Sequence, residues 1–179
     1  MNFTPKEAQM EAEEIRQALS SVAEHFTAHP EDAKSEDKPA TATLESGLRI
    51  RVEGLGSWSV TTDMPVALGG EGSAPSPGWL RRAAQAACEA TMIAIRAAQE
   101  GIVLDRLQVT VGSVSDDRGL LGLADAPAGP TESWARIEVT AKEVSPEKLQ
   151  EIIKWAEAHS PVTDALTRPV PHKLEIETG

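Results

Sequence analysis

The stretch that decides the fold is Ser76-Pro77-Gly78-Trp79-Leu80-Arg81-Arg82-Ala83-Ala84-Gln85-Ala86-Ala87-Cys88-Glu89-Ala90-Thr91-Met92. It predicts a long helix with Ser76 as N-cap and Pro77 at the first helical position. The helix should run to about Glu100 and end at Gly101. Apolar residues fall on more than one side of it, so we expect it to be the buried centre of the domain, with Cys88 on the same face as Leu80, Ala84, Met92 and Ile95.

Cys88 is the only cysteine among 179 residues, so it cannot form an internal disulfide. It is either a small buried apolar residue or a reactive thiol. A reactive thiol must be a thiolate near neutral pH, which a nearby cation or hydrogen-bond donors would favour. Cys88 lies about three turns into its helix, beyond the reach of the helix dipole. Arg81, two turns back on approximately the same face, could act only indirectly.

Composition bounds the partners and the compartment. The formal net charge of −11 argues against nucleic acid and anionic membrane, because both attract basic surfaces. No apolar run approaches the roughly 20 residues needed to cross a bilayer. The N-terminus has neither the basic nor the apolar region of a secretory signal. A lone cysteine fits a reducing compartment. We therefore expect a cytoplasmic protein.

The N-terminal segment predicts a separate helix and linker. Thr4, Pro5 and Glu7 form a capping-box pattern at the start of a helix that runs to about Ala28. Its apolar residues form one stripe: Ala8, Ala12, Ile15, Leu19, Val22 and Phe26. This stripe packs either on its own domain or on a partner subunit. The charged residues after the helix read as a linker, so we expect a helix and linker over residues 1–38 and the main domain over 39–179.

The rest of the chain predicts strands in runs. An antiparallel three-strand meander is expected at 40–44, 48–53 and 58–62, followed by a flexible glycine-rich connector at 66–75. A strand at 104–114, a turn at 116–119, a loop at 120–130 and another strand at 134–139 come next. A helix opens at Ser145-Pro146, and a final strand covers 170–177. We expect residues 159–166 to end the last helix. Runs of strands, without strict alternation with helices, predict an α+β fold with an antiparallel sheet.

Two stretches carry a resemblance to a known family. Pro77 is followed by a helix-borne Ala-Ala-Cys run that ends at Cys88. After the next helix comes His159-Ser160-Pro161-Val162-Thr163-Asp164-Ala165-Leu166. These two motifs, and the order of helices and strands around them, resemble the OsmC/Ohr family, named for osmotically induced protein C and organic hydroperoxide resistance protein. The resemblance extends from about Ala40 to the C-terminus.

The resemblance implies a fold, an assembly and a chemistry. It implies an intertwined homodimer whose antiparallel sheets wrap around long central helices, with the active site at the subunit interface. Members of the family are typically thiol peroxidases. A first cysteine attacks an organic hydroperoxide and becomes a sulfenic acid, a second cysteine resolves it as a disulfide, and an arginine and a glutamate activate the first thiol.

Residue by residue, the match is partial. Cys88 falls on the peroxidatic cysteine. Ser160 falls where the resolving cysteine is expected, and a hydroxyl cannot form a disulfide. Gly78 stands where the family has its glutamate.

The family's arginine has no clear counterpart. Leu68 lies near one expected position, with Asp63 before it. Arg49 and Arg51 lie in the meander, but their spacing selects neither.

Other side chains suggest weaker sites. Trp79 could wall a pocket, or it could be a core or interface anchor. His159 beside Ser160 invites a Ser-His nucleophile, but adjacent residues usually point apart and no glycine elbow surrounds the serine. The four histidines show no metal-ligand spacing, so we expect no metal site. We also expect no cofactor.

Two functional hypotheses remain. The first is a stress-related, homodimeric hydroperoxide reductase that uses Cys88 and is regenerated by an external thiol. The second is a catalytically lapsed member that binds a small apolar or acyl ligand at the dimer interface, since Gly78 and Ser160 stand where catalytic residues should be.

Overall fold

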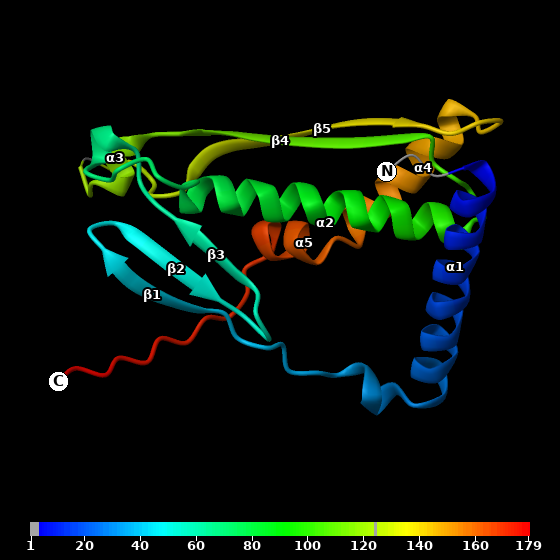
Figure 1. The fold of residues 1–179 in the computed structure, drawn as a ribbon, viewed down its shortest axis with the longest axis horizontal. Helices are drawn as coiled ribbons and strands as arrows, with labels where there is room; N and C mark the ends of the chain where they lie inside the picture. Colours follow the sequence, from blue (N-terminus) through cyan, green and yellow to red (C-terminus); the bar gives the residue numbers. More distant parts are fainter. Residues whose placement is uncertain (1–3, 124) are drawn as a thin grey trace. The chain divides into compact units, whose positions relative to one another are not determined.

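The computed structural model describes residues 4–123 and 125–179 and has an α+β fold (Figure 1). The α-helices are α1 (Pro5–Ala28), α2 (Pro77–Gln99), α3 (Asp117–Leu120), α4 (Pro146–Ala158) and α5 (Pro161–Thr167). The strands are β1 (Thr41–Ser46), β2 (Arg49–Glu53), β3 (Ser59–Thr62), β4 (Arg106–Ser115) and β5 (Pro130–Thr140). Short 3-10 turns cover Pro30–Ala33 and Val66–Leu68.

The strands form two small sheets (Figure 1). The predicted meander is confirmed: β2 pairs antiparallel with β1 and with β3. Strands β4 and β5 form the other sheet. They run in opposite directions, since Asp105 N–H donates to Thr140 O while the Ser133 hydroxyl donates to Gly112 O. Strand β5 begins at Pro130, earlier than predicted, and α3 occupies the predicted turn.

The chain divides into two compact units. We call the first, Met1–Arg16, Gln85–Val111 and Trp134–Gly179, the cysteine unit, and the second, Gln17–Ala84 and Gly112–Ser133, the meander unit. The domain boundary expected after residue 38 stays a prediction.

The apolar core of the cysteine unit is small. Ile93 of α2 packs with Ile152 and Ala156 of α4, all almost fully buried. Partly buried residues complete it: Met92, Ile102, Leu104, Leu107, Val109, Ile137, Ile153 and Trp155. The helix predicted from Ser145-Pro146 therefore packs against α2 in this core, and Ser145 caps it by accepting from Lys148 N–H.

The buried face of α2 is shifted from the predicted one. The helix begins and ends as expected, with the Ser76 hydroxyl accepting from Trp79 N–H. Its buried residues are Gln85, Glu89, Ile93, Ala97 and Ala98. Ala84, which was expected on the core face, is exposed, and Cys88 is partly buried. The face was assigned from apolar residues alone, whereas the structure buries two polar side chains that bond to each other.

Helix α1 forms as predicted. Thr4 N–H donates to Glu7 Oε2 at 2.7 Å, and Glu7 N–H donates to Thr4 Oγ1 at 3.3 Å, so the capping box is confirmed. The apolar stripe is largely exposed in the single chain, including Ile15, Val22 and Phe26. The exposed stripe keeps the alternative of a partner subunit open.

Two predictions near the C-terminus are wrong. Residues 159–166 do not simply end α4: they contain α5, whose N-cap is Ser160 and whose first residue is Pro161. The same Ser-Pro signal had predicted α2 and α4. Residues 170–177 do not form the predicted strand; they have no regular structure and are exposed. Their apolar residues alternate as in a strand, but no neighbouring strand of the described chain pairs with them.

The glycine-rich segment after β3 is organised rather than a flexible connector. Asp63, 2% exposed, accepts hydrogen bonds from the backbone N–H groups of Met64, Glu71 and Ser73 and from the Ser73 hydroxyl, at 2.7 to 3.2 Å. These bonds, those to Ser73 most strongly, hold the pKa of Asp63 below its usual value. Gly70 is required here, because a Cβ would lie 1.9 Å from Met64 O.

This loop predicts a specific pH dependence. Because the folded pKa of Asp63 lies below the unfolded one, its contribution to stability is complete above the ordinary aspartate value of about 3.9 and is lost as the pH falls through the folded value. We expect Asp63→Asn to lower the urea midpoint at pH 7 and to lose less stability between about pH 5 and pH 2 than wild type. Asp37→Asn, in the exposed linker, is the control; identical pH profiles for Asp63→Asn and wild type would contradict the assignment.

Candidate functional site

The candidate site of the cysteine unit is centred on a contact between α2 and the start of α5. The Ser160 hydroxyl donates a hydrogen bond to the sulfur of Cys88, with Oγ and Sγ 3.2 Å apart. Ser160 is completely buried (0% exposed), whereas Cys88 is partly exposed. The structure thus brings together two site residues that lie 72 positions apart in the chain.

Local capping explains why Ser160 stands where it does. Its Oγ accepts a hydrogen bond from the N–H of Thr163 at 3.4 Å, which caps α5. Pro161 occupies the first helical position, where its missing N–H costs nothing. One hydroxyl therefore accepts from the backbone of α5 and donates to the thiol on α2. Both roles fix its orientation.

A second polar chain runs beside the first. Glu89, 5% exposed, accepts from the Thr163 hydroxyl at 3.1 Å and from Gln85 Nε2 at 3.0 Å, both on Oε1. The Oε1 of Gln85 is buried and has no hydrogen-bond partner. Thr163 thus connects the two chains, since its N–H bonds to Ser160 and its hydroxyl to Glu89. A buried carboxylate must be hydrogen-bonded to be tolerated, and α5 supplies one of its donors.

Only indirect sequence signals point to Glu89, Gln85 and Thr163 as residues of this site. Gln85 and Glu89 are four residues apart, the spacing at which helix side chains meet, within an otherwise alanine-rich stretch. Two polar residues at that spacing are equally typical of an exposed face. Their partner Thr163 is far away in sequence, so nothing in the chain identified the face as buried.

The chemistry available at Cys88 follows from its donor. A hydroxyl that donates to sulfur stabilises the thiolate over the thiol, because charge-assisted hydrogen bonds are stronger than neutral ones. The same hydroxyl cannot form a disulfide. Among the described residues of the cysteine unit, no arginine or lysine hydrogen-bonds to the Cys88 sulfur. The site therefore offers a polarised thiol with a hydroxyl at 3.2 Å.

His159 takes no part in a Ser-His pair with its neighbour. Its ring stacks on Trp155, with centroids 4.1 Å apart, and its Nδ1 lies 2.7 Å from Trp155 O. Ser160 points instead to Cys88, so the two adjacent side chains diverge. Within residues 4–123 and 125–179, no group of three or more His, Cys, Asp or Glu side chains is arranged to hold a metal ion.

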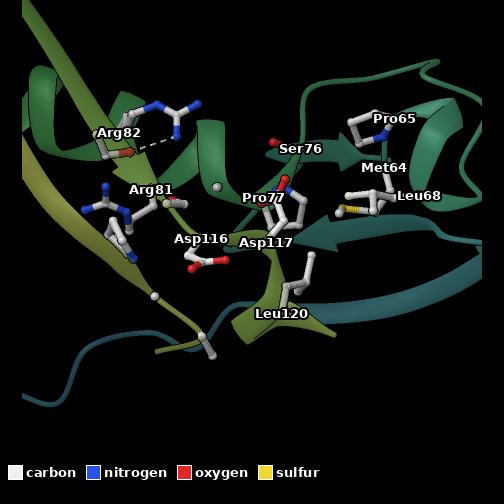
Figure 2. A pocket seen from close by; sticks show the side chains of 16 residues that line it. Met64, Pro65, Leu68, Ser76, Pro77, Arg81, Arg82, Asp116, Asp117 and Leu120 are labelled. Carbon is white, nitrogen blue, oxygen red and sulfur yellow. Dashed lines mark hydrogen bonds between the residues drawn. The ribbon is translucent and has the colours of Figure 1, made fainter. Parts of the chain in front are cut away.

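The other sequence candidates lie in the meander unit. Gly78 and Leu68 line a pocket at the start of α2 (Figure 2). Trp79 is not among its lining residues and is 49% exposed, so it is neither a pocket wall there nor a core anchor. Arg49 bonds to Glu45 and Ser73, and Arg51 bonds to Glu53. Both guanidinium groups are thus engaged within their own unit.

Comparison with known proteins assigns the family. The model of the OsmC-like protein family matches residues 70–175, more than half of the chain, and includes both Cys88 and Ser160. The chain belongs to the OsmC-like protein family. No curated protein sequence matches it.

Solved structures of OsmC-like proteins share the fold. The OsmC-like protein of Mycoplasma pneumoniae is similar with a TM-score of 0.64 at 18% identity, over 75% of this chain and 90% of that one. An organic hydroperoxide resistance protein OsmC of Legionella pneumophila gives 0.55 at 22%, over 75% and 92%. The organic hydroperoxide resistance protein OhrB of Bacillus subtilis gives 0.50 at 23%, over 79% and 98%.

No helix formed by the described residues of this OsmC-like protein combines the length and apolar character needed to cross a membrane.

The Cys88–Ser160 geometry predicts that a second cysteine would close a disulfide. We expect Ser160→Cys to form an intramolecular bond with Cys88 under mild oxidation, because the Oγ–Sγ separation of 3.2 Å requires only a small closure to the S–S length of about 2.05 Å. Intact mass would fall by two hydrogen atoms, and alkylation would label no thiol.

The matched control for this disulfide is Thr167→Cys, about two turns further along α5, where the native hydroxyl bonds only within its own helix. It should keep two alkylatable thiols. Two free thiols in oxidised Ser160→Cys would show that α5 does not hold residue 160 against Cys88.

Proposed function

We propose that this OsmC-like protein reduces organic hydroperoxides with Cys88 and is regenerated by an external thiol. The observation that carries the proposal is the hydrogen bond from the buried Ser160 hydroxyl to the Cys88 sulfur. It supplies a donor that favours the thiolate, the form that attacks peroxides. Cys88 as a residue is partly exposed in the single chain.

The proposed cycle needs one protein thiol and two reductant thiols. The Cys88 thiolate attacks the distal oxygen of ROOH, the O–O bond breaks, and alkoxide leaves as ROH after taking a proton. The sulfenic acid then condenses with an external thiol to a mixed disulfide and water. A second external thiol attacks that disulfide, releases the oxidised reductant and returns the Cys88 thiol. Ser160 takes part only as a hydrogen-bond donor.

The comparisons support this proposal at the level of fold. Two structures of similar fold carry the name organic hydroperoxide resistance protein. This chain differs in having one cysteine, so the reductant must supply the sulfur that closes the cycle. A dithiol is suited to this role, because its second thiol resolves the mixed disulfide intramolecularly.

We further propose that the functional unit is a homodimer. Residues 170–179 lie exposed without regular structure, and Leu174 and Ile176 are 76% and 74% exposed. Apolar residues at alternate positions of such a segment suit pairing with a sheet edge of a second copy. Small exposed residues on α2, Ala84, Ala87, Thr91 and Ala94, would let a second backbone approach closely.

The activity prediction compares two proteins. Wild type should consume cumene hydroperoxide with dithiothreitol as reductant, and Cys88→Ser should fall to the rate without protein, because the nucleophile is lost. In the absence of reductant, dimedone should label wild type as a sulfenic acid and should not label Cys88→Ser. Equal peroxide consumption by the two proteins, or no sulfenic acid in wild type, would reject the peroxidase and favour a catalytically lapsed member.

The dimer prediction uses the alternation of the C-terminal segment. Leu174→Glu/Ile176→Glu should shift the protein from dimer to monomer in analytical ultracentrifugation, because it places charge in the proposed apolar contact. Lys173→Glu/Glu175→Lys alters the intervening positions without changing net charge and should leave a dimer. A wild-type monomer, or an unaltered dimer in the first variant, would refute this contact.

A further inference from the structure

The pocket at the start of α2 is a feature that the proposed thiol chemistry does not use. It lies within the meander unit and has a volume of about 510 Å³, within the range of small-molecule sites. Four segments line it: the start of α2 with Ser76, Pro77 and Gly78, the end of β4 with α3, the loop after β3, and residues 128–130 at the start of β5 (Figure 2).

Two arginines of this pocket lack a counter-ion. Most arginines of the chain form ion pairs: Arg16, Arg49, Arg51, Arg96, Arg106, Arg118 and Arg168. Among the described residues, Arg81 and Arg82 form none, although acidic residues outnumber basic ones in the chain. Two adjacent unpaired cations in one pocket of an acidic protein are evidence for an anionic ligand.

The hydrogen bonds of these arginines point the same way. Nη2 of Arg81 is buried without any hydrogen-bond partner. Nη1 of Arg82 reaches only the Ser113 hydroxyl, at 3.4 Å. A buried donor left unmatched is costly, and a guanidinium fork fits a carboxylate or phosphate in two parallel bonds. The start of α2 adds the positive end of a long helix dipole.

Acidic residues in the lining of the same pocket limit the charge of the ligand. Asp116 lines it but is bound by Arg118, whose hydrogen bonds lower the pKa of Asp116. Asp117 lines it as well. Two carboxylates close by disfavour a dianion such as a phosphate monoester and leave room for one negative charge.

The remaining lining is largely apolar. Its apolar members are Met64, Pro65, Leu68, Pro77, Leu120, Ala128 and Pro130, and Ser76, Ser113 and Ser115 also line it. Such a surface suits a hydrocarbon body next to a charged head. We propose that this pocket binds small monocarboxylates with an apolar body, held through their carboxylate by Arg81 and Arg82. Cys88 is not among the lining residues.

Gly78 provides a sharp test. A Cβ at this position would lie 3.9 Å from Nη1 of Arg82 and 3.8 Å from the Ser76 hydroxyl, both ordinary contacts. Gly78→Glu would therefore place a carboxylate beside the guanidinium and compete with the ligand from within the chain. Gly78→Gln has nearly the same size without the charge, so it is the matched control.

The experiment measures octanoate binding by calorimetry, with 1-octanol and inorganic phosphate as comparison probes. Wild type and Gly78→Gln should bind octanoate at least about ten-fold more tightly than 1-octanol, since charge-assisted bonds carry that much affinity. Gly78→Glu and Arg81→Gln/Arg82→Gln should each lose at least about ten-fold. Arg136→Gln, on β5, should bind like wild type.

Three results would overturn the proposal. Equal affinity for octanoate and 1-octanol would mean an apolar groove without a carboxylate site. Displacement of octanoate by inorganic phosphate at similar concentration would mean a general anion site. Equal octanoate affinity in Gly78→Glu and Gly78→Gln would place the ligand away from the arginines. This comparison holds even if the double arginine variant fails to fold.

Discussion

The hydrogen bond between Ser160 and Cys88 is the constraint on which the candidate site depends. It connects the middle of α2 to Ser160, the N-cap residue of α5, and the same serine hydroxyl caps that helix. Because Ser160 is completely buried, its hydroxyl is shielded from bulk water, and leaving it without an acceptor would lower the stability of the fold. The thiol therefore acts as a structural acceptor in the resting protein as well as a potential nucleophile.

The polar chain beside it gives this coupling its rigidity. Thr163 bonds to Ser160 through its N–H and to Glu89 through its hydroxyl, so α5 contacts α2 by two hydrogen bonds, one at each of two adjacent residues of that helix. Ser160 is thus held both by the thiol on α2 and by the helix that it caps, and Thr163 connects the same helix to Glu89.

Sequence patterns predicted what depends on local chemistry. The capping box at Thr4, the Ser76 and Ser145 caps and the meander follow from neighbouring residues, and the structure confirms them. The pattern at Ser160-Pro161 carried the same signal, but it was interpreted only as the end of α4. The pairing of Ser160 with Cys88 was accessible only through family resemblance, since spacing alone does not reveal contacts across 72 positions.

The failures share a physical cause: they concern partners distant in sequence. Residues 170–177 alternate as a strand does, yet a strand exists only when another strand supplies its hydrogen bonds. Asp63 orders the glycine-rich loop by accepting from backbone N–H groups up to ten residues away, and no side-chain pattern marks those donors. Apolarity predicts a different buried face of α2, whereas the structure buries Gln85 and Glu89, which bond to each other, and Glu89 also accepts from the distant Thr163.

A serine in place of a resolving cysteine leaves the first step of the proposed cycle, attack on the peroxide, as it is. It changes the second step, in which the sulfenic acid is resolved. The hydroxyl still donates to sulfur, so attack on a peroxide keeps its hydrogen-bond support. Once Cys88 is a sulfenic acid, no internal thiol can trap it, and its lifetime depends on how quickly an external thiol reaches the exposed side of the residue. Buried Ser160 blocks approach from the α5 side. A one-cysteine member of this family is thus expected to be limited by reductant access, where a two-cysteine arrangement would be limited by disulfide reduction.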